Sequence, residues 1–365
     1  MDTTIEQLPI PATPDAAGGI DFARSAAVSN EVERALWGHD DFRLEVAERL
    51  TMMQPMPDRE RVLGVARVGG EIVANARLGF PQRDNLRTAY LQIEVLPAHR
   101  RRGTATALLA FAQRQAAARG RTVLMSWSDA PTDGAGGPVL VPPTGAGGFP
   151  ADDASSVLAL RSGFELVQVD RQSVLDLAGL RPADGIAGGL EVQESEAAGM
   201  GSGHYGLVGW TDRCPDGLVA DYALLRQRMS TDPPLGGFAQ EEESWDAGRI
   251  RREEATALEG GATTLVCAVQ HRSSGQLVGH TILERFGSRP AVVYQEDTLV
   301  LEEHRGHRLG MWLKAANLRR ALGEWPDARR VYTWNAEENS FMLAVNVALG
   351  FRPVGRTAGW QKVLP

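Results

Sequence analysis

The sequence contains very little cysteine and lysine. Only two of its 365 residues are cysteines, Cys214 and Cys267, and they form no CxxC pair. Neither a disulfide framework nor a cysteine-ligated zinc site is therefore expected in a chain of this length. Lysine occurs only at positions 314 and 362, so nearly all of the 38 basic residues are arginine. We attribute this bias to a GC-rich genome before any chemistry.

Long apolar runs and signal-peptide features are also missing. No stretch approaches the roughly 18 apolar residues of a membrane helix. The first residues, MDTTIEQLPIPATPDAAGG, include acidic side chains where a signal peptide needs basic ones. The formal net charge of -8 argues against nucleic acid as a partner. These absences predict a cytoplasmic protein with no membrane or nucleic-acid partner.

The rest of the composition is typical of a globular protein, with 43% hydrophobic and 23% charged residues. At roughly 100–200 residues per domain, the length predicts two domains. Residues 1–20 are rich in Pro, Ala and Gly, which predicts a flexible arm, and residues 178–190 are typical of a linker. The predicted domains are therefore residues 21–180 and residues 190–365.

The predicted elements occur twice in the same order, which is a helix, a hairpin, a strand, a helix, a strand, a helix and a last strand. In the first half these are residues 29–51, 62–80, 89–96, 103–120, 122–128, 153–162 and 164–177. In the second half they are residues 216–230, 263–286, 291–301, 309–324, 330–336, 337–349 and the strand region after it. The order predicts two similar α/β (α+β mixed) domains.

An arginine- and glycine-rich turn follows the same strand in each half. It reads PAHRRRGTATALL at residues 97–109 and EEHRGHRLGMWLK at residues 302–314. Each turn leads into a helix start, where backbone N–H groups lack partners and the helix dipole is positive. Glycine lets such a backbone approach an anion closely. Both turns are therefore predicted to bind a diphosphate.

These turns resemble the acyl-CoA signature of GCN5-related N-acetyltransferases (GNAT family), in which Arg/Gln-x-x-Gly-x-Gly/Ala follows a strand ending in Val. Arg100 follows Val95 at the same distance as Arg305 follows Val300. The pair Gly350-Phe351, with asparagines before it, resembles the end of the family pattern, and Gly163-Phe164 matches it in the first half. The chain thus resembles tandem, actinobacterial GNAT proteins over nearly its whole length. The resemblance implies two GNAT-like domains, each a central, mostly antiparallel twisted sheet flanked by helices.

The resemblance implies acetyl-CoA as co-substrate and no metal. It places the cofactor against the two turns, the adjoining strand ends and three asparagines. In the second half these residues are Leu299, Val300, Leu301, Arg305, Gly306, His307, Arg308, Leu309, Gly310, Asn335, Asn339 and Asn346. In the first half they are Arg100, Arg101, Arg102, Gly103, Thr104 and Ala105.

The sequence departs from the family pattern at two places. Arg308 replaces a usual glycine, so we expect its side chain to point outward or onto a phosphate. Many members carry a tyrosine four residues before the glycine of Gly-Phe, which protonates the leaving thiolate. Asn346 and Ala159 stand there instead. The proton must then come from another group, or the thiolate leaves unassisted.

Strand alternation predicts which side chains face the acceptor in the second half. In this family the strand before the turn often carries the base that deprotonates the amine, and its backbone N–H holds the oxyanion. Counted back from Arg305, the residues on the pocket face are Tyr294, Glu296 and Thr298. Glu296 is the predicted base. A one-residue slip would expose Gln295 and Asp297 instead.

The same count in the first half gives the hydrocarbon side chains of Ala89, Leu91 and Ile93, whereas a slip would expose Gln92 and Glu94. The second half is therefore predicted to be catalytic and the first half degenerate. The predicted catalytic residues are Glu296, Asp297 and Thr298. The predicted substrate-binding residues are Tyr294, Met229, Trp245 and Trp334.

The predicted function is acetyl-CoA-dependent transfer of an acyl group to a primary amine of a small molecule or peptide, by direct attack of the amine on the thioester. A role in secondary metabolism fits this reading. The alternative is a non-catalytic acyl-CoA sensor or scaffold. A monomer or a homodimer is expected.

Overall fold

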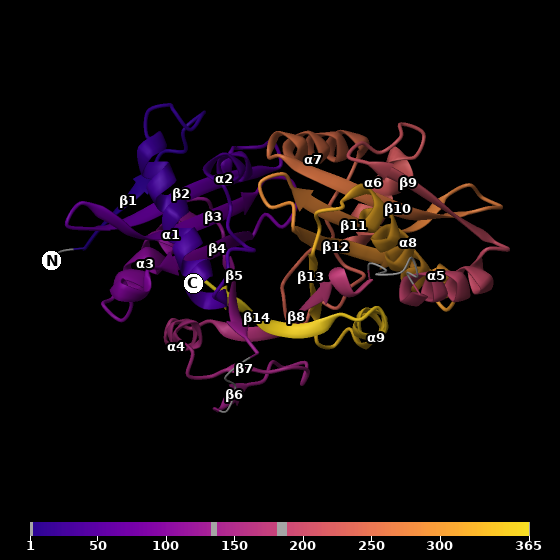
Figure 1. The fold of residues 1–365 in the computed structure, drawn as a ribbon. Coiled ribbons are helices and arrows are strands. Elements are labelled where there is room, and N and C mark those ends of the chain that lie inside the picture. The colour runs from indigo at the N-terminus through magenta and orange to yellow at the C-terminus, as the bar shows by residue number, and fades with distance from the viewer. Residues whose placement is uncertain (1–2, 133–136, 181–187, 365) are drawn as a thin grey trace. The chain divides into compact units, whose positions relative to one another are not determined.

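The computed structural model describes residues 3–132, 137–180 and 188–364, and it divides into two compact units (Figure 1). Unit 1 consists of residues 1–170, 235–241 and 355–365, and unit 2 of residues 171–234 and 242–354. The repeat predicts two units, but the predicted boundaries are displaced. The chain leaves unit 1 within strand β8 (Glu165–Asp176) and returns to it for residues 355–363.

Unit 1 is a mostly antiparallel sheet with helices packed against it. Its strands, in sheet order, are β1 (Thr3–Leu8), β2 (Arg59–Val68), β3 (Glu71–Pro81), β4 (Thr88–Val95), β5 (Val123–Pro131) and β14 (Arg352–Val363). Its helices are α1 (Gly19–Trp37), α2 (Val46–Met53), α3 (Thr104–Ala117) and α4 (Ala154–Arg161), with a 3-10 turn, η1, at Pro97–His99. The β4–β5 pair is parallel.

Two predictions for the start of the chain are wrong. Residues 3–8 are not a flexible arm, because they form β1 and pair with residues 63–68 of β2. The predicted helix over residues 29–51 is two helices, because Gly38 ends α1 in the left-handed conformation. Between β5 and α4 the chain forms the short strands β6 (Val139–Leu140) and β7 (Phe149–Pro150), and residues 133–136 lie outside the described residues.

Unit 2 repeats this architecture. Its strands, in sheet order, are β13 (Arg330–Ala336), β12 (Val292–Val300), β11 (Leu277–Phe286), β10 (Ala262–His271) and β9 (Tyr205–Thr211). Its helices are α5 (Gly188–Gly201), α6 (Val219–Met229), α7 (Ala247–Glu259), α8 (Leu309–Glu324) and α9 (Ser340–Ala348), with 3-10 turns η2 (Ala178–Leu180) and η3 (Glu302–His304). The predicted linker 178–190 lies partly outside the described residues, and α5 begins within it.

The sheet of unit 2 is covered on both faces. On one face, which we call the α8 face, Leu265, Leu283 and Val293 form a core with residues of α8. On the other, the α6–α7 face, Ile282 and Leu299 pack with residues of α6 and α7. Strand alternation separates these two sets, so each side chain of β12 can be assigned to one face. The α/β fold class, with a central, mainly antiparallel sheet in each unit, is confirmed.

Candidate active site

Strands β12 and β13 separate soon after they begin. Within the described residues the parallel ladder between them has three pairs, from Val292–Arg330 to Tyr294–Tyr332. Beyond these pairs β12 has no ladder partner on its β13 side among the described residues, and we call this break in the ladder the opening. Beyond the ladder, the Thr333 hydroxyl reaches back to the backbone carbonyl of Gln295 at 3.4 Å. The strand on which the base was predicted runs along this break.

Strand β12 also contains a β-bulge at this opening. Thr281 of β11 pairs with Thr298, whereas Leu283 pairs with Gln295, so Glu296 and Asp297 together stand opposite one residue of β11. The buried side chain of Gln295 holds the bulge. Its amide nitrogen donates to the Ile282 carbonyl at 2.8 Å and to the Thr281 hydroxyl at 3.0 Å.

The bulge changes which side chains share a face. Gln295 and Thr298 both point to the α8 face, because their partners on β11 are two residues apart. The prediction that Tyr294, Glu296 and Thr298 share a face is therefore wrong for Thr298. Its hydroxyl lies 2.8 Å from that of Thr281 and so helps to hold the bulge.

Glu296 and Asp297 both lie on the α6–α7 face. Asp297 forms an ion pair with Arg226 of α6, with 3.3 Å between Oδ2 and Nε, and lies 4.0 Å from Nε2 of the buried His280. The carboxyl group of Glu296 interacts electrostatically with Glu284 and with Asp297 itself. The bulge thus places the predicted base, Glu296, and the residue of the slip alternative, Asp297, on one face, whereas strict alternation would separate them.

The two adjacent carboxyl groups have opposite pKa shifts. Glu296 reaches solvent, but protein atoms crowd its carboxyl group, and this loss of hydration, with repulsion from Glu284 and Asp297, raises its pKa to about 8. Burial would raise the pKa of Asp297 as well, but Arg226 and His280 outweigh this effect and hold the pKa of Asp297 below the usual range. Asp297 is thus a fixed carboxylate, and Glu296 exchanges a proton near neutral pH.

Arg226 is positioned by aromatic residues. Its guanidinium lies over the ring of Trp245 at 4.6 Å and bonds the buried hydroxyl group of Tyr222. A second guanidinium, that of Arg249, lies over the same ring at 4.1 Å. Trp245, predicted to bind substrate, therefore holds these two arginines. Met229, also predicted to bind substrate, packs in the core beneath the α6–α7 face.

Aromatic rings border the other end of the opening. Tyr294 and Trp334 are stacked with 6.4 Å between ring centroids, and Phe286 meets Tyr294 edge-on at 6.2 Å. Tyr294 pairs with Glu284 across β12 and β11, so these two side chains share the α6–α7 face. The predicted substrate residues Tyr294 and Trp334 thus form an aromatic wall next to the carboxyl groups.

The arginine-glycine turns have the same geometry in both units. Nε of Arg305 donates to the Val300 carbonyl at 3.0 Å, and Nε of Arg100 donates to the Val95 carbonyl at 3.0 Å. Each signature arginine therefore ties the turn to the end of its strand. The same bond in both units explains why the five-residue spacing repeats.

Each turn has two left-handed positions, and the units place glycine at different ones. In unit 2 they are Gly306 (φ 86°) and Arg308 (φ 55°), and in unit 1 they are Arg101 (φ 60°) and Gly103 (φ 85°). The turn thus forms with an arginine at either position, although a side chain there is strained. Arg308 is exposed, in line with the outward arrangement that was one of the two expected. It bonds Gln193 and Glu196 of α5.

The turn leaves a helix start open in unit 2. The first α-helical bond of α8 runs from the N–H of Trp312 to the carbonyl of Arg308, so the N–H groups of the preceding three residues lack helical partners. An atom added at Cβ of Gly310 would meet nothing within 4 Å. The N–H groups and this space fit a diphosphate.

The remaining predicted cofactor residues have varied surroundings. Leu299 is buried on the α6–α7 face, Val300 and Leu301 are partly buried, and Leu309 is buried against the α8 face. The side chain of His304, on η3, lies 3.1 Å from the Tyr205 hydroxyl, and the His307 ring lies 5.5 Å from the Tyr205 ring. In unit 1, the turn residues 100–103 are exposed. Thr104 is buried and Ala105 is partly buried.

The three asparagines have different roles. Asn339 caps α9, because its side chain accepts a hydrogen bond from the Met342 N–H at 3.2 Å. Asn346, in α9, is buried and donates to Oδ1 of Asn335 at 2.6 Å. Asn335 therefore links α9 to the end of β13 beside the opening.

Within the described residues of unit 1, the equivalent strand β4 has no such bulge against β3. Strand β4 pairs with β3 in unbroken register from Gly79–Tyr90 to Ala74–Val95. Ala89 and Leu91 lie in the core with α3, so the predicted hydrocarbon set points away from α1. The slip alternative is correct there, because Glu94 contacts Ser29 of α1.

Glu94 of unit 1 is sealed by an arginine. The Arg77 guanidinium binds both carboxylate oxygens, at 2.6 and 2.9 Å. Burial opposes ionisation of Glu94, but Arg77 outweighs it and lowers the pKa to about 2. Glu33 of α1 lies nearby, and loss of hydration, with repulsion from Glu94 and Asp129, raises its pKa to about 7. Unit 1 thus has a perturbed carboxyl group but no bulge beside it.

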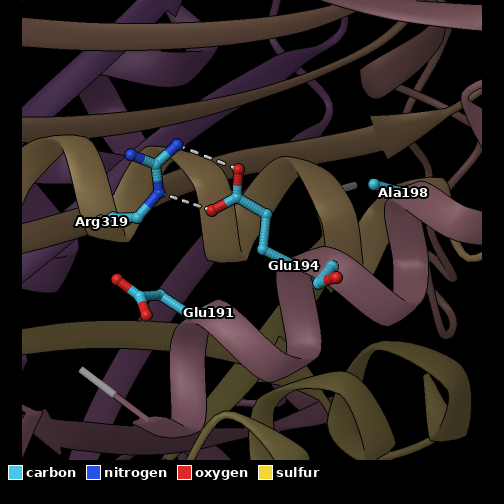
Figure 2. Close-up of a pocket in the computed structure, with 5 residues that line it drawn as sticks. Glu191, Glu194, Ala198 and Arg319 are labelled. Carbon is cyan, nitrogen blue, oxygen red and sulfur yellow. Dashed lines mark hydrogen bonds and ion pairs between the residues drawn. The ribbon is translucent and has the colours of Figure 1, made fainter. Parts of the chain in front are cut away.

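A surface cavity of about 320 Å³ lies elsewhere on unit 2, between α5 and α8 (Figure 2). Arg319 and Glu194 form a two-point ion pair across it, with contacts of 2.6 and 3.0 Å. Glu191 also lines it. None of these residues belongs to the site on β12.

Two general findings bear on the class of protein. In the part of the chain that the structure describes, no cluster of three or more His, Cys, Asp or Glu side chains is arranged to hold a metal ion. Among the same residues, no helix has both the length and the apolarity needed to cross a membrane.

Comparisons with known proteins find similar sequences and folds. Residues 29–135, in unit 1, match the model of the acetyltransferase (GNAT) family. A tandem GNAT protein from the clavulanic acid biosynthesis pathway is 26% identical, with a TM-score of 0.71 and coverage of 99% of this chain and 98% of that one. A GCN5-related N-acetyltransferase from Sphaerobacter thermophilus is 14% identical, with a TM-score of 0.60 and coverage of 99% and 95%, and shares the fold. No curated protein matches the sequence.

The splayed strands, the arginine-glycine turns and these likenesses define a two-unit acetyltransferase fold. Residues 29–135 match the GNAT family model, and the chain is similar over nearly its whole length to a tandem GNAT protein.

Proposed function

We propose that the protein is an acetyl-CoA-dependent N-acetyltransferase that acylates a primary amine, and that unit 2 carries the chemistry. The bulge in β12 is the observation that carries this proposal. It places Glu296, whose pKa is raised to about 8, beside the opening between β12 and β13. The equivalent strand of unit 1 is regular.

The residues present in unit 2 fit acetyl-CoA. The open helix start of α8 and the space at Gly310 suit the diphosphate, while Arg305 fixes the turn to β12. The opening between β12 and β13 suits an extended arm, which would reach backbone N–H groups at the bulge. When bound, acetyl-CoA supplies an acyl group activated as a thioester.

Glu296 acts as the base in this proposal. As a carboxylate it accepts a proton from the ammonium form of the acceptor, directly or through water, so that the neutral amine can attack. A pKa near 8 makes it a stronger base than an ordinary carboxylate, at the cost of a smaller ionised fraction at neutral pH. The fixed carboxylate of Asp297 attracts the acceptor's positive charge.

The surroundings of Glu296 favour a cationic acceptor with an apolar part. Glu284 and Asp297 supply negative charge, and Tyr294 and Trp334 supply the aromatic wall. A small amine or the amino end of a peptide meets these requirements. Because a similar tandem protein comes from the clavulanic acid biosynthesis pathway, we include secondary metabolism in the proposal.

Unit 1 has a second candidate function, which is to bind an acyl-CoA without transferring the acyl group. Its turn carries the same arginine tie as that of unit 2, and the family model matches this part of the chain. Its Glu94, however, is sealed by Arg77, and its strand has no bulge. A scaffold or sensor role for unit 1 is compatible with catalysis in unit 2.

Two matched variants test the assignment. Glu296→Gln is expected to lose most turnover with a panel of amines and to keep its affinity for acetyl-CoA in calorimetry, because the amide cannot accept the proton. Glu33→Gln removes the perturbed glutamate of unit 1 and is expected to keep full turnover. The reverse pattern would place the chemistry in unit 1. Absence of acetyl-CoA binding by the unchanged protein would refute the function itself.

A further inference from the structure

Lys314 is a buried lysine with no ionic partner. It lies in α8 with 1% of its surface exposed. Its ammonium group is 5.4 Å from the centre of the Phe351 ring, and within the described part of the chain no carboxylate or hydrogen-bond acceptor pairs with it. Burial lowers its pKa to about 7. Burying an unpaired amine is unfavourable, so the fold alone does not explain this residue.

Lys314 lies at about the same depth in unit 2 as the bulge. The turn after β12 reverses the chain, and α8 packs on β10, β11 and β12. Lys314 is six residues beyond Arg308, which is about 9 Å along a helix axis. Asp297 is three residues before Val300, which is about 10 Å along a strand. From these ideal rises we place the lysine about level with the bulge, on the α8 face.

The side chain of Lys314 is expected to lean toward the open helix start. Side chains on a helix lean toward its N-terminus, and residues four apart share a face. Lys314 is four residues after Gly310, where the space around the missing Cβ is open. An extended arm that starts at the diphosphate site and enters the opening would therefore pass along this face.

A second unused polar atom lies nearby. Asn346 is 2% exposed, and its Oδ1 has no hydrogen-bond partner. The Phe351 N–H donates to the Asn346 carbonyl at 3.0 Å, which holds the ring near both Asn346 and Lys314. The fold thus buries a donor and an acceptor between α8 and the end of α9 without pairing either.

The equivalent positions of unit 1 carry neither the lysine nor the asparagine. Leu109 stands where Lys314 stands, each nine residues after its signature arginine, and Leu109 is also buried. Ala159 stands where Asn346 stands. An apolar side chain therefore satisfies the fold at this position. Lysine, bulge and Glu296 occur together in unit 2 and are all replaced in unit 1.

Neighbouring carboxylates do not compensate for Lys314. The carboxylates of β11 and β12 lie on the opposite face of the sheet. Two carboxylates of α5 pair with arginines, one with Arg319 of α8 and one with Arg308, which precedes α8. The residues concerned are Glu284, Glu296 and Asp297 in the first group and Glu194 and Glu196 in the second.

We propose that Lys314 gives the proton that the sulfur of CoA takes up when it leaves. This rests on the proposed function of unit 2. As the bond between the acyl carbon and sulfur breaks, the sulfur keeps the electron pair, Lys314 passes it one proton, and CoA departs as the thiol. The attacking nitrogen loses its second proton to solvent as the amide forms. Solvent also receives the proton that Glu296 took from the amine, and it returns one proton to the neutral lysine, so that one proton is released overall. Arginine could not replace it, because a guanidinium does not lose its proton.

The first test uses the unchanged protein with CoA thiol as the probe. The ultraviolet absorbance of the thiolate is followed against pH for free and bound CoA. Because an ammonium group stabilises a thiolate, bound CoA is expected to ionise about one pH unit or more below free CoA. Lys314→Met is expected to remove this shift. A bound thiol that titrates like free CoA in the unchanged protein would overturn the proposal.

The second test separates binding from chemistry. Lys314→Met is expected to reduce kcat about 100-fold while the Kd for acetyl-CoA stays within a few-fold. Lys314→Arg should not restore turnover, and Leu109→Met, the matched change in unit 1, should leave it unchanged. Full turnover in Lys314→Met would overturn this proposal alone. Failure of the unchanged protein to bind acetyl-CoA would overturn the proposed function as well.

Discussion

Replacing Arg77 by methionine is expected to destabilise unit 1 strongly. The change keeps most of the buried stem but removes the guanidinium that binds both oxygens of Glu94. Glu94 is 4% exposed, so its carboxylate would then be buried without its counterion. Breaking a buried ion pair by removing one partner typically costs about 3–5 kcal/mol.

The pKa of Glu94 gives an independent magnitude. The fold lowers it from 4.5 to about 2, which corresponds to about 3 kcal/mol of stabilisation at neutral pH. Because the folded pKa is the lower one, this stabilisation is complete above the ordinary pKa of glutamate and is lost as the pH falls toward 2. Without Arg77, burial raises the pKa instead, so the deficit of the variant should shrink between pH 7 and pH 5.

Urea unfolding followed by circular dichroism at both pH values measures these differences. Hydrogen exchange of the β3 and β4 amides would locate the loss in unit 1. The double variant Arg77→Met/Glu94→Gln is the matched control and should recover much of the stability, since no charge is left buried. A variant as stable as the unchanged protein at pH 7, or a deficit independent of pH, would refute the claim that Arg77 seals Glu94.

The other predictions concern unit 2. Gly306→Ala should lower the free energy of unfolding by about 1 kcal/mol in thermal unfolding, because φ is 86° there. Arg308→Gly should be neutral or stabilising, since it removes a side chain from a residue at φ 55°. Equal losses of stability in the two variants would contradict the strain argument. Turnover should rise as the pH increases toward 8, because Glu296 becomes ionised there. Arg226→Met should move this rising limb of the pH–rate profile to higher pH, because Arg226 lowers the pKa of Glu296. A rising limb that does not move in the variant would exclude Glu296 as its source.

The sequence predicts the elements whose patterns are local. The hairpins, the helices after the two turns and the glycine-rich turns themselves follow from periodicity and glycine positions, and they lie within a few residues of the predicted bounds. Three elements of unit 2, α5, β9 and α7, were not predicted. The short strand β9 has two glycines and two aromatic residues among its seven positions, so its alternation of apolar and polar residues is weak.

The arrangement of the site could not be read from alternation. A bulge adds one residue to β12, and nothing in the residues from Tyr294 to Thr298 marks it, because the residue that holds it, Gln295, bonds a carbonyl on another strand. The only available signal is length, since β12 has nine residues and β4 has eight. Lys314 could have been noticed as a charged residue in an apolar helical run, but its burial depends on tertiary packing.

The last strand of the chain has a consequence for how the protein is made. Residues 355–363 pair with β5, and Trp360 and Ala358 lie in the core of unit 1 beside residues of α3 and β4. A ribosome that has finished the first 170 residues has therefore not yet supplied a strand that this core requires. Translation at about 5–20 residues per second leaves the partial sheet waiting for roughly ten seconds or more. The edge of β5 stays unpaired during that time, so the two units cannot be separated into independent proteins by a simple cut between them.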